Sequence, residues 1–210
     1  MATPPDRRER RRRQTRAEIV AAAWDIVREQ GLAGLAVRDL AERIGLKAPS
    51  IYSYFGSKHE IYDAMFHQGY VEFAAAMAEF EEDADAATSA ADPRDLARAA
   101  SHRFFEFCTS DPVRYQLLFQ RTIPDFVPSE ESYAVAVQSY GRMQRQLATI
   151  GITEPGAVDL WTAVLTGLTD QQISNDPGGE RWERLVDQAV DMLLRELAPS
   201  AVSSPTERKP

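Results

Sequence analysis

The sequence VRDLAERIGLKAPSIYSYF, residues 37–55, has the pattern of two short helices joined by a tight corner. The apolar residues of its first half recur at three- and four-residue steps and so share one helical face: Val37, Leu40, Ala41 and Ile44. Gly45 tolerates the left-handed backbone that such a corner requires. Ala41 presents only a methyl group where the second helix crosses, and Ile51 and Phe55 continue the core on that helix. This spacing predicts a helix-turn-helix.

The outer face expected for the second helix suits a polyanion. Its side chains supply hydrogen-bond donors and aromatic rings: Lys47, Ser50, Tyr52, Ser53 and Tyr54. No Asp or Glu lies between Glu42 and Glu60. Lys58 stands at the start of the next expected helix, where its ammonium and free backbone N–H groups can share one phosphate. Any compact helical hairpin has a glycine and a small residue, so it is the outer face that favours DNA as the partner.

Apolar residues recur at helical steps along almost the whole chain, which predicts an all-α fold of about nine helices. The first helix is expected over residues 15–30, opened by a capping box of Thr15 with Glu18 and closed by Gly31. Capping signals mark the later helix starts: Ser57 with Glu60, Asp92 before Pro93, Asp111 before Pro112, Ser129, and Thr153 with Pro155. The helix after Ser129 is expected to bury Tyr133, Val137, Tyr140, Met143, Leu147 and Ile150.

The charge is distributed unevenly. The chain has 210 residues and a net charge of −8, yet residues 1–60 hold 12 basic against 8 acidic residues, and residues 61–210 hold 12 against 24. We expect a disordered Arg-rich arm at 1–14, a DNA-binding domain at 15–60, a helical body at 61–198 with a linker ending at Ala91, and a disordered tail at 199–210. The arm is either a solvated tail or a segment that orders on DNA.

Residues 15–65 resemble the DNA-binding domain of the TetR (tetracycline-repressor-like) family. The resemblance rests on Thr15–Ala23, Gly31-Leu32, Val37–Ala41, Ile44–Leu46, Ser50–Phe55 and Lys58. It implies that the second helix of the motif lies in the major groove. Base-edge contacts are then expected from Arg38, Ala48, Pro49 and Ser50, and phosphate contacts from Tyr52, Tyr54 and Lys58. Lys47 is also expected to bind DNA. Many members have threonine where this chain has Val37, so the contact of that hydroxyl is not expected here.

The resemblance also implies a transcriptional repressor that a small-molecule effector releases from an inverted-repeat operator. A ligand-independent DNA-binding or architectural protein is the alternative. A homodimer is expected through the last two helices, whose apolar stripes are Val158, Trp161, Leu165 and Leu168, and Trp182, Leu185, Val186, Ala189, Val190, Leu193, Leu194 and Leu197. Burial of both stripes within one subunit is the competing interpretation.

The helical body is rich in aromatic residues, which are either core or the lining of an effector cavity. The expected ligand-binding residues are Phe104, Phe107, Cys108, Gln116, Phe119, Tyr140 and Trp161. No phosphate loop or nucleophile elbow is present, and the three histidines have no ligand spacing with Cys108, so we expect neither an enzyme nor a metal or other cofactor. One cysteine and no apolar run of about 18 residues favour a cytoplasmic protein without a membrane span.

Overall fold

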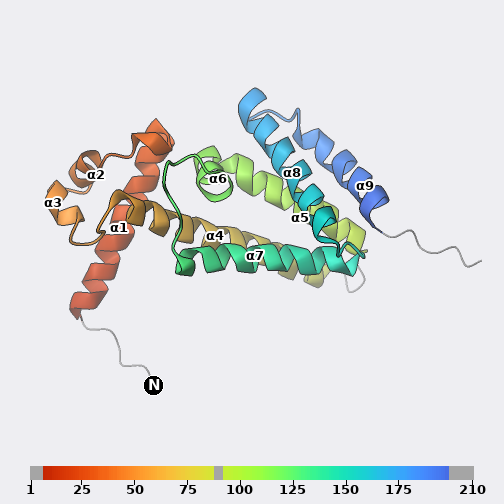
Figure 1. Ribbon diagram of the computed structural model, residues 1–210, viewed down its shortest axis with the longest axis horizontal. Helices are drawn as coiled ribbons and strands as arrows, with labels where there is room; N and C mark the ends of the chain where they lie inside the picture. The colour runs from red at the N-terminus through yellow and green to blue at the C-terminus, as the bar shows by residue number, and fades with distance from the viewer. Residues whose placement is uncertain (1–6, 88–91, 199–210) are drawn as a thin grey trace, which may run out of the picture. The chain divides into compact units, whose positions relative to one another are not determined.

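The computed structural model describes residues 7–87 and 92–198, and within these ranges it contains helices and no strands (Figure 1). The expected all-α class and the nine α-helices are confirmed for this part of the chain. The helices are α1 (Arg7–Gln30), α2 (Val37–Arg43), α3 (Ala48–Ile51), α4 (Lys58–Ala87), α5 (Pro93–Ser110), α6 (Pro112–Phe119), α7 (Glu130–Thr149), α8 (Pro155–Asn175) and α9 (Val186–Leu197). Two short 3-10 helices, η1 (Leu32–Gly34) and η2 (Glu183–Leu185), precede α2 and α9.

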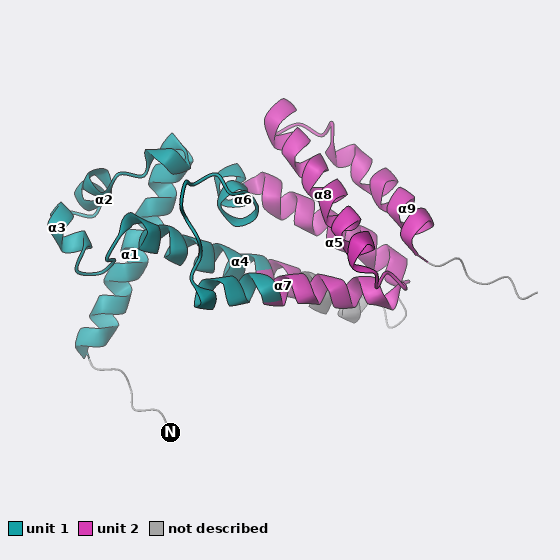
Figure 2. Ribbon diagram, viewed as in Figure 1, with its two compact units in different colours: residues 1–73, 111–137 teal, residues 74–110, 138–210 magenta. Residues whose placement is uncertain are grey.

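The chain forms two compact units, which Figure 2 colours separately. Unit 1 comprises residues 1–73 and 111–137, and unit 2 comprises residues 74–110 and 138–210. The divisions fall inside α4 and α7, so the units do not coincide with the domains expected at 15–60 and 61–198. Residues 1–6 of the expected arm, residues 88–91 of the expected linker and the expected tail at 199–210 lie outside the described residues.

The core of unit 1 forms around one face of α1. That face meets residues from α2, α3 and α4, and the shared cluster includes Ile19, Ala23, Ile26, Val27, Leu40, Ile51, Ile61 and Met65, each almost fully buried. Leu117 of α6 completes the same cluster. Burying an aliphatic side chain of this size contributes roughly 1.5–3 kcal/mol, so this cluster is the main stabilising element of the unit.

The corner between α2 and α3 has the geometry that its sequence predicts. Gly45 has a φ of 69°, in the left-handed region, and the Leu46 N–H donates to the Ala41 carbonyl at 2.8 Å. Ala41 and Leu40 are buried, and Val37 and Ile44 pack on the same core. α3 ends at Ile51, earlier than expected, and Phe55 reaches the core from the segment that follows it.

The expected start of the first helix at Thr15 is wrong, as is the expected disorder of residues 7–14. α1 begins at Arg7, so Thr15 is an interior residue and does not cap. Arginine is among the better helix formers, and the Glu9–Arg13 pair at 3.5 Å and the Gln14–Glu18 hydrogen bond at 3.0 Å bridge successive turns. These residues are exposed, as their composition requires, but they extend a helix instead of forming a coil.

Most of the other capping predictions are confirmed. The Asp92 and Asp111 carboxylates accept from the Arg94 and Arg114 N–H groups at 2.9 and 3.1 Å. Ser129 Oγ accepts from the Ser132 N–H at 3.2 Å. α8 instead has Glu154 as its N-cap, without a side-chain hydrogen bond, and α9 begins at Val186.

Side chains of α4 fasten α6 and α7 within unit 1. The Asp63 carboxylate accepts from the Ser129 N–H at 2.7 Å, from the Ser129 hydroxyl at 2.8 Å and from the buried Ser132 hydroxyl at 3.0 Å. The Tyr70 hydroxyl donates to the Leu118 carbonyl at 3.1 Å. Both helices thereby start or end on α4 through hydrogen bonds that few alternative arrangements would satisfy.

In unit 2, α5, α8 and α9 pack together around one apolar cluster. It contains most of the stripe residues expected at a dimer interface: Val158, Trp161, Leu165, Val186, Val190, Leu193 and Leu194. These residues are buried within the single chain, so they form its core rather than its outer surface. Arg98 and His102 of α5 reinforce the packing through Asp191 and Asp187 of α9 at 2.7 and 2.8 Å.

The expected buried face of α7 is only partly correct. Leu147 is buried and Met143 and Ile150 pack on the core of unit 2, whereas Tyr133, Val137 and Tyr140 are exposed. The periodic pattern fixed which residues share a face, but it did not show how far along the helix that face is covered.

Ala41→Leu tests the corner. The added methylenes have no space where α2 crosses α3, so we expect a loss of roughly 1–3 kcal/mol in the free energy of unfolding. Ala21→Leu is the matched control, because Ala21 is an exposed residue of α1 and its enlargement meets solvent. Urea unfolding followed by circular dichroism measures both. Equal stability of the two variants would contradict the close crossing.

Candidate nucleic-acid interface

The segment from α2 to the start of α4 presents an exposed surface without a carboxylate after Glu42. Lys47, Pro49 and Tyr52 are exposed, and Tyr52 keeps 53% of its surface accessible. Ala48 and Ser50 are half-buried, as is Tyr54, which packs against the core of unit 1 and is therefore less exposed than its sequence position suggests. Arg38 projects from the first turn of α2 with 88% of its side chain exposed.

The position of α2 is set by α1 as well as by the core. Arg43 donates two hydrogen bonds to the Glu29 carboxylate of α1, at 2.8 and 2.6 Å. This bidentate contact lowers the pKa of Glu29 and raises that of Arg43, in both residues chiefly through the side-chain hydrogen bonds. The two-pronged geometry holds α2 at one angle on α1, which a single hydrogen bond would not do.

The chain after α3 is held by an arginine that the sequence did not single out. The Arg16 guanidinium donates to the Tyr54 carbonyl and lies 4.0 Å from the centroid of the Phe55 ring. Arg12, one turn earlier on α1, donates to the Ser53 carbonyl at 3.4 Å. The signal was available in principle, because Arg12 and Arg16 stand seven and three residues before Ile19 on the buried face of α1.

Lys58 is positioned by the cap of α4. The Ser57 hydroxyl accepts from the Glu60 N–H at 3.1 Å, as the capping-box prediction requires, while the Glu60 carboxylate accepts from the Gly56 N–H at 2.7 Å. Lys58 Nζ lies 5.4 Å from the Tyr62 ring centroid. The Tyr62 hydroxyl donates to the Leu32 carbonyl at 2.5 Å, which ties the start of α4 to the turn after α1. Lys58 therefore lies at the N-terminus of α4, whose position these hydrogen bonds fix.

The seven expected ligand-binding residues are divided between the two units. Gln116 and Phe119 belong to unit 1, where the Phe119 ring packs against Tyr70, Phe73 and Tyr115 with ring centroids 5.5–5.7 Å apart. The other five belong to unit 2. Trp161 lies in its core and Phe104 packs on that core, Phe107 and Cys108 are buried, and Tyr140 is 41% exposed.

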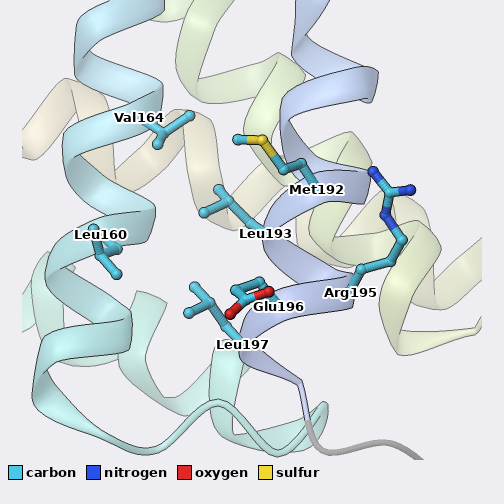
Figure 3. Close-up of a pocket in the computed structure, with 7 residues that line it drawn as sticks. All are labelled: Leu160, Val164, Met192, Leu193, Arg195, Glu196 and Leu197. Carbon is cyan, nitrogen blue, oxygen red and sulfur yellow. The ribbon is translucent and has the colours of Figure 1, made fainter.

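A surface hollow of about 430 Å³ lies instead between α8 and α9 (Figure 3). Its lining is mainly aliphatic: Leu160, Val164, Met192, Leu193 and Leu197, with Arg195 and Glu196 on α9. None of the seven expected ligand-binding residues is among them. Leu160 and Met192 are exposed by 54% and 49%, so two large apolar side chains of this lining are accessible to solvent in the single chain.

A family model described as bacterial regulatory proteins, tetR family, matches residues 19–65, which include α2, α3 and the second half of α1. The HTH-type transcriptional activator FasR of Mycolicibacterium smegmatis is 27% identical over 109 residues, 52% of this chain and 47% of FasR. The tetracycline repressor protein class A from transposon 1721 of Escherichia coli is 40% identical over 47 residues, 22% of either chain. The matched part is thus about half or less of these two relatives.

The fold is shared more widely than the sequence. The transcriptional regulator FadR from Bacillus subtilis, solved in complex with stearoyl-CoA, superposes with a TM-score of 0.64 at 16% identity, covering 85% of this chain and 97% of FadR. A helix-turn-helix near the N-terminus of an otherwise helical chain defines the class of bacterial transcription regulators to which these relatives are assigned. Residues 19–65 of this chain are thus similar to the tetR family of bacterial regulatory proteins.

No helix among residues 7–87 and 92–198 has the length and hydropathy needed to span a bilayer.

Tyr62→Phe tests how the start of α4 is held. Losing the hydrogen bond to Leu32 should cost about 1 kcal/mol in the free energy of unfolding at neutral pH. Burial raises the pKa of Tyr62 from 10.0 to about 12. The unfolded state therefore loses this proton first, and wild-type stability should fall between pH 10 and 12.

The variant lacks that group, so its deficit relative to wild type should shrink across the same pH interval. Tyr52→Phe, at an exposed tyrosine, should leave stability unchanged both at neutral pH and between pH 10 and 12. Urea titrations at several pH values give the comparison, and a deficit that stays constant up to pH 12 would contradict the assignment.

Proposed function

We propose that the protein is a cytoplasmic, sequence-specific DNA-binding repressor that a small-molecule effector releases from an inverted-repeat operator. The observation that carries the proposal is the surface formed by α2, α3 and the start of α4. It combines an exposed basic and hydroxyl-rich face with a corner whose geometry leaves α3 free to enter a groove. Arg38, Ala48, Pro49 and Ser50 are the proposed base readers, and Tyr52, Tyr54 and Lys58 the proposed phosphate contacts. Lys47 is a further proposed DNA-binding residue.

The direction of regulation is proposed from the match of highest identity among the two relatives described above. The tetracycline repressor protein is 40% identical over 47 residues, whereas FasR, 27% identical over 109 residues, is named an activator. A repressor needs only to occupy its operator, and the small α3 surface is sufficient for that. Ligand-independent binding is the alternative, and it predicts that no small molecule changes the affinity for DNA.

An apolar effector is favoured by the aromatic residues of the body. The proposed ligand-binding residues remain Phe104, Phe107, Cys108, Gln116, Phe119, Tyr140 and Trp161. The tilted rings around Phe119 supply one apolar surface, and FadR, of similar fold, was solved with stearoyl-CoA. Pockets for small ligands are lined mainly by hydrophobic and aromatic side chains.

A homodimer is proposed through α8 and α9, but through their outer faces. Leu160, Val164 and Gly167 recur at four- and three-residue steps on α8, and a Cβ added at Gly167 would meet no atom within 4 Å. Met192 and Leu197 of α9 line the same hollow as Leu160 and Val164 (Figure 3). A second copy would cover this aliphatic surface, and Gly167 would allow its helix to approach closely.

Selection from a pool of random duplexes tests the proposed DNA binding. The full chain should enrich an inverted repeat whose half-site centres are about one helical turn, roughly 34–36 Å, apart, because a two-fold dimer requires a two-fold site. Enrichment of a single asymmetric site, or of no sequence, would contradict the proposal.

On the enriched duplex, Lys58→Ala should flatten the dependence of log Kd on log salt by about two units, one for each subunit of the dimer. The preference among base sequences should persist, because phosphate contacts do not read bases. Arg184→Ala, at an exposed residue of η2, is the control and should leave the slope unchanged. Fluorescence anisotropy provides both measurements.

Leu160→Asp combined with Met192→Asp tests the dimer. Both side chains are exposed in the single chain, so the carboxylates should prevent association while the helical content stays at the wild-type level. Val71→Asp places the same charge on an exposed apolar residue of α4 and should leave the dimer intact. Sedimentation at micromolar concentration decides, and a double variant that still sediments as a dimer would refute this interface.

A further inference from the structure

The first two turns of α1 form a basic helical extension. Six of the seven residues between Arg7 and Arg13 are arginines, and residues 7–14 are all exposed. They continue without a break into the part of α1 that is buried in unit 1. A continuous helix fixes where each side chain starts, so these charges have defined positions relative to α3, unlike charges on a flexible tail.

One face of the extension continues the side of α1 that contacts the helix-turn-helix. Arg8, Arg12 and Arg16 follow one another at four-residue steps, and Ile19 and Ala23 continue the same face with side chains that are fully buried. The inner two arginines contact the chain directly after α3. Arg16 donates to the Tyr54 carbonyl, and Arg12 donates to the Ser53 carbonyl at 3.4 Å.

Arg8 lies one helical turn beyond these contacts and is exposed, and Arg11 is exposed beside Arg12. The extension therefore brings additional cations to the segment after α3 that carries Tyr52 and Tyr54. These tyrosines are the proposed phosphate contacts of the helix-turn-helix. No Asp or Glu occurs between Glu42 and Glu60, and Glu9, the one acid within residues 7–13, pairs with Arg13 at 3.5 Å.

We propose that this extension is a second DNA-binding element, in which Arg8, Arg11 and Arg12 bind backbone phosphates beside those held by Tyr52 and Tyr54. The inference rests on the proposed function, since it requires α3 to lie against DNA. Guanidinium groups pair with phosphate through planar, two-pronged hydrogen bonds, and Arg12 has the geometry to exchange its long contact with Ser53 for such a pair. The extension adds affinity without reading sequence.

The variant Arg8→Gln/Arg11→Gln/Arg12→Gln tests the charges. Each arginine that neutralises a phosphate contributes about 0.9 to the salt slope, so three in each of two subunits should flatten it by up to roughly five units. Arg94→Gln/Arg181→Gln/Arg184→Gln removes three exposed charges from unit 2 and should leave the slope as in wild type. Replacing the same three residues of α1 by lysine should restore most of the slope.

A second pair of variants tests the helix. Gln14→Pro keeps every charge but interrupts the hydrogen bonding of α1 between the extension and the core, whereas Gln14→Ala keeps the helix intact. If the helix positions the arginines, Gln14→Pro should flatten the salt dependence of DNA binding as the triple glutamine variant does. Gln14→Ala should leave that dependence unchanged. A full slope in Gln14→Pro would overturn the proposed placement in favour of a flexible tail.

Each variant is measured by anisotropy on the selected duplex and on a scrambled duplex of equal length, with circular dichroism and sedimentation confirming folded dimers. A smaller slope on both duplexes with unchanged base preference supports the proposal. If wild type enriches an operator but the triple glutamine variant keeps the wild-type salt slope, the proposed role of the extension is refuted and the proposed function is not. Failure of wild type to enrich any sequence, with the slope on the scrambled duplex still lowered by the triple variant, refutes the regulatory function and leaves the phosphate contacts standing.

Discussion

The close crossing of α2 over α3 is the constraint on which the DNA-facing surface depends. Ala41 is buried at that crossing, Gly45 turns the chain in a left-handed conformation, and the Leu46 N–H closes the corner on the Ala41 carbonyl. With the corner fixed, Ile51 enters the core of unit 1 and the other side of α3 is left to solvent. The corner sets the shape of this DNA-facing surface. Hydrogen bonds between α1 and the motif, two through Arg43 and one through Arg16, then stabilise it.

Local sequence signals predicted most of what is local in the structure. The helix-turn-helix, the N-caps at Asp92, Asp111 and Ser129 and the break at Gly31 depend on residues within one turn of each other, and hydrogen bonds confirm them. The start of α1 was missed because low hydrophobicity was interpreted as disorder, although exposed arginines form helix readily. The capping box at Thr15 was a chance match inside a longer helix.

Long-range packing was beyond the sequence pattern. The stripes of α8 and α9 have the same periodicity whether a partner subunit or α5 covers them, and in this chain the residues of both stripes are largely enclosed by its own helices. Leu160 and Met192, which are exposed, lie between stripe residues in the sequence. The helical periodicity did not predict that they form an apolar surface. In the same way, nothing near Leu117 indicated that α6 completes the core around α1. The proposed ligand-binding residues were consequently drawn from two different units.

The carboxylate of Asp63 connects two amides at the start of α7 to α4. The Ser129 amide lies in an exposed loop, where amide protons ordinarily exchange with solvent within the fast fluctuations of the chain, yet it is bonded to Asp63 at 2.7 Å. The Ser132 amide depends on the Ser129 hydroxyl, which the same carboxylate holds. Deuterium therefore enters both positions only when α4 and the start of α7 separate, so these two amides report an opening event that neither helix shows alone.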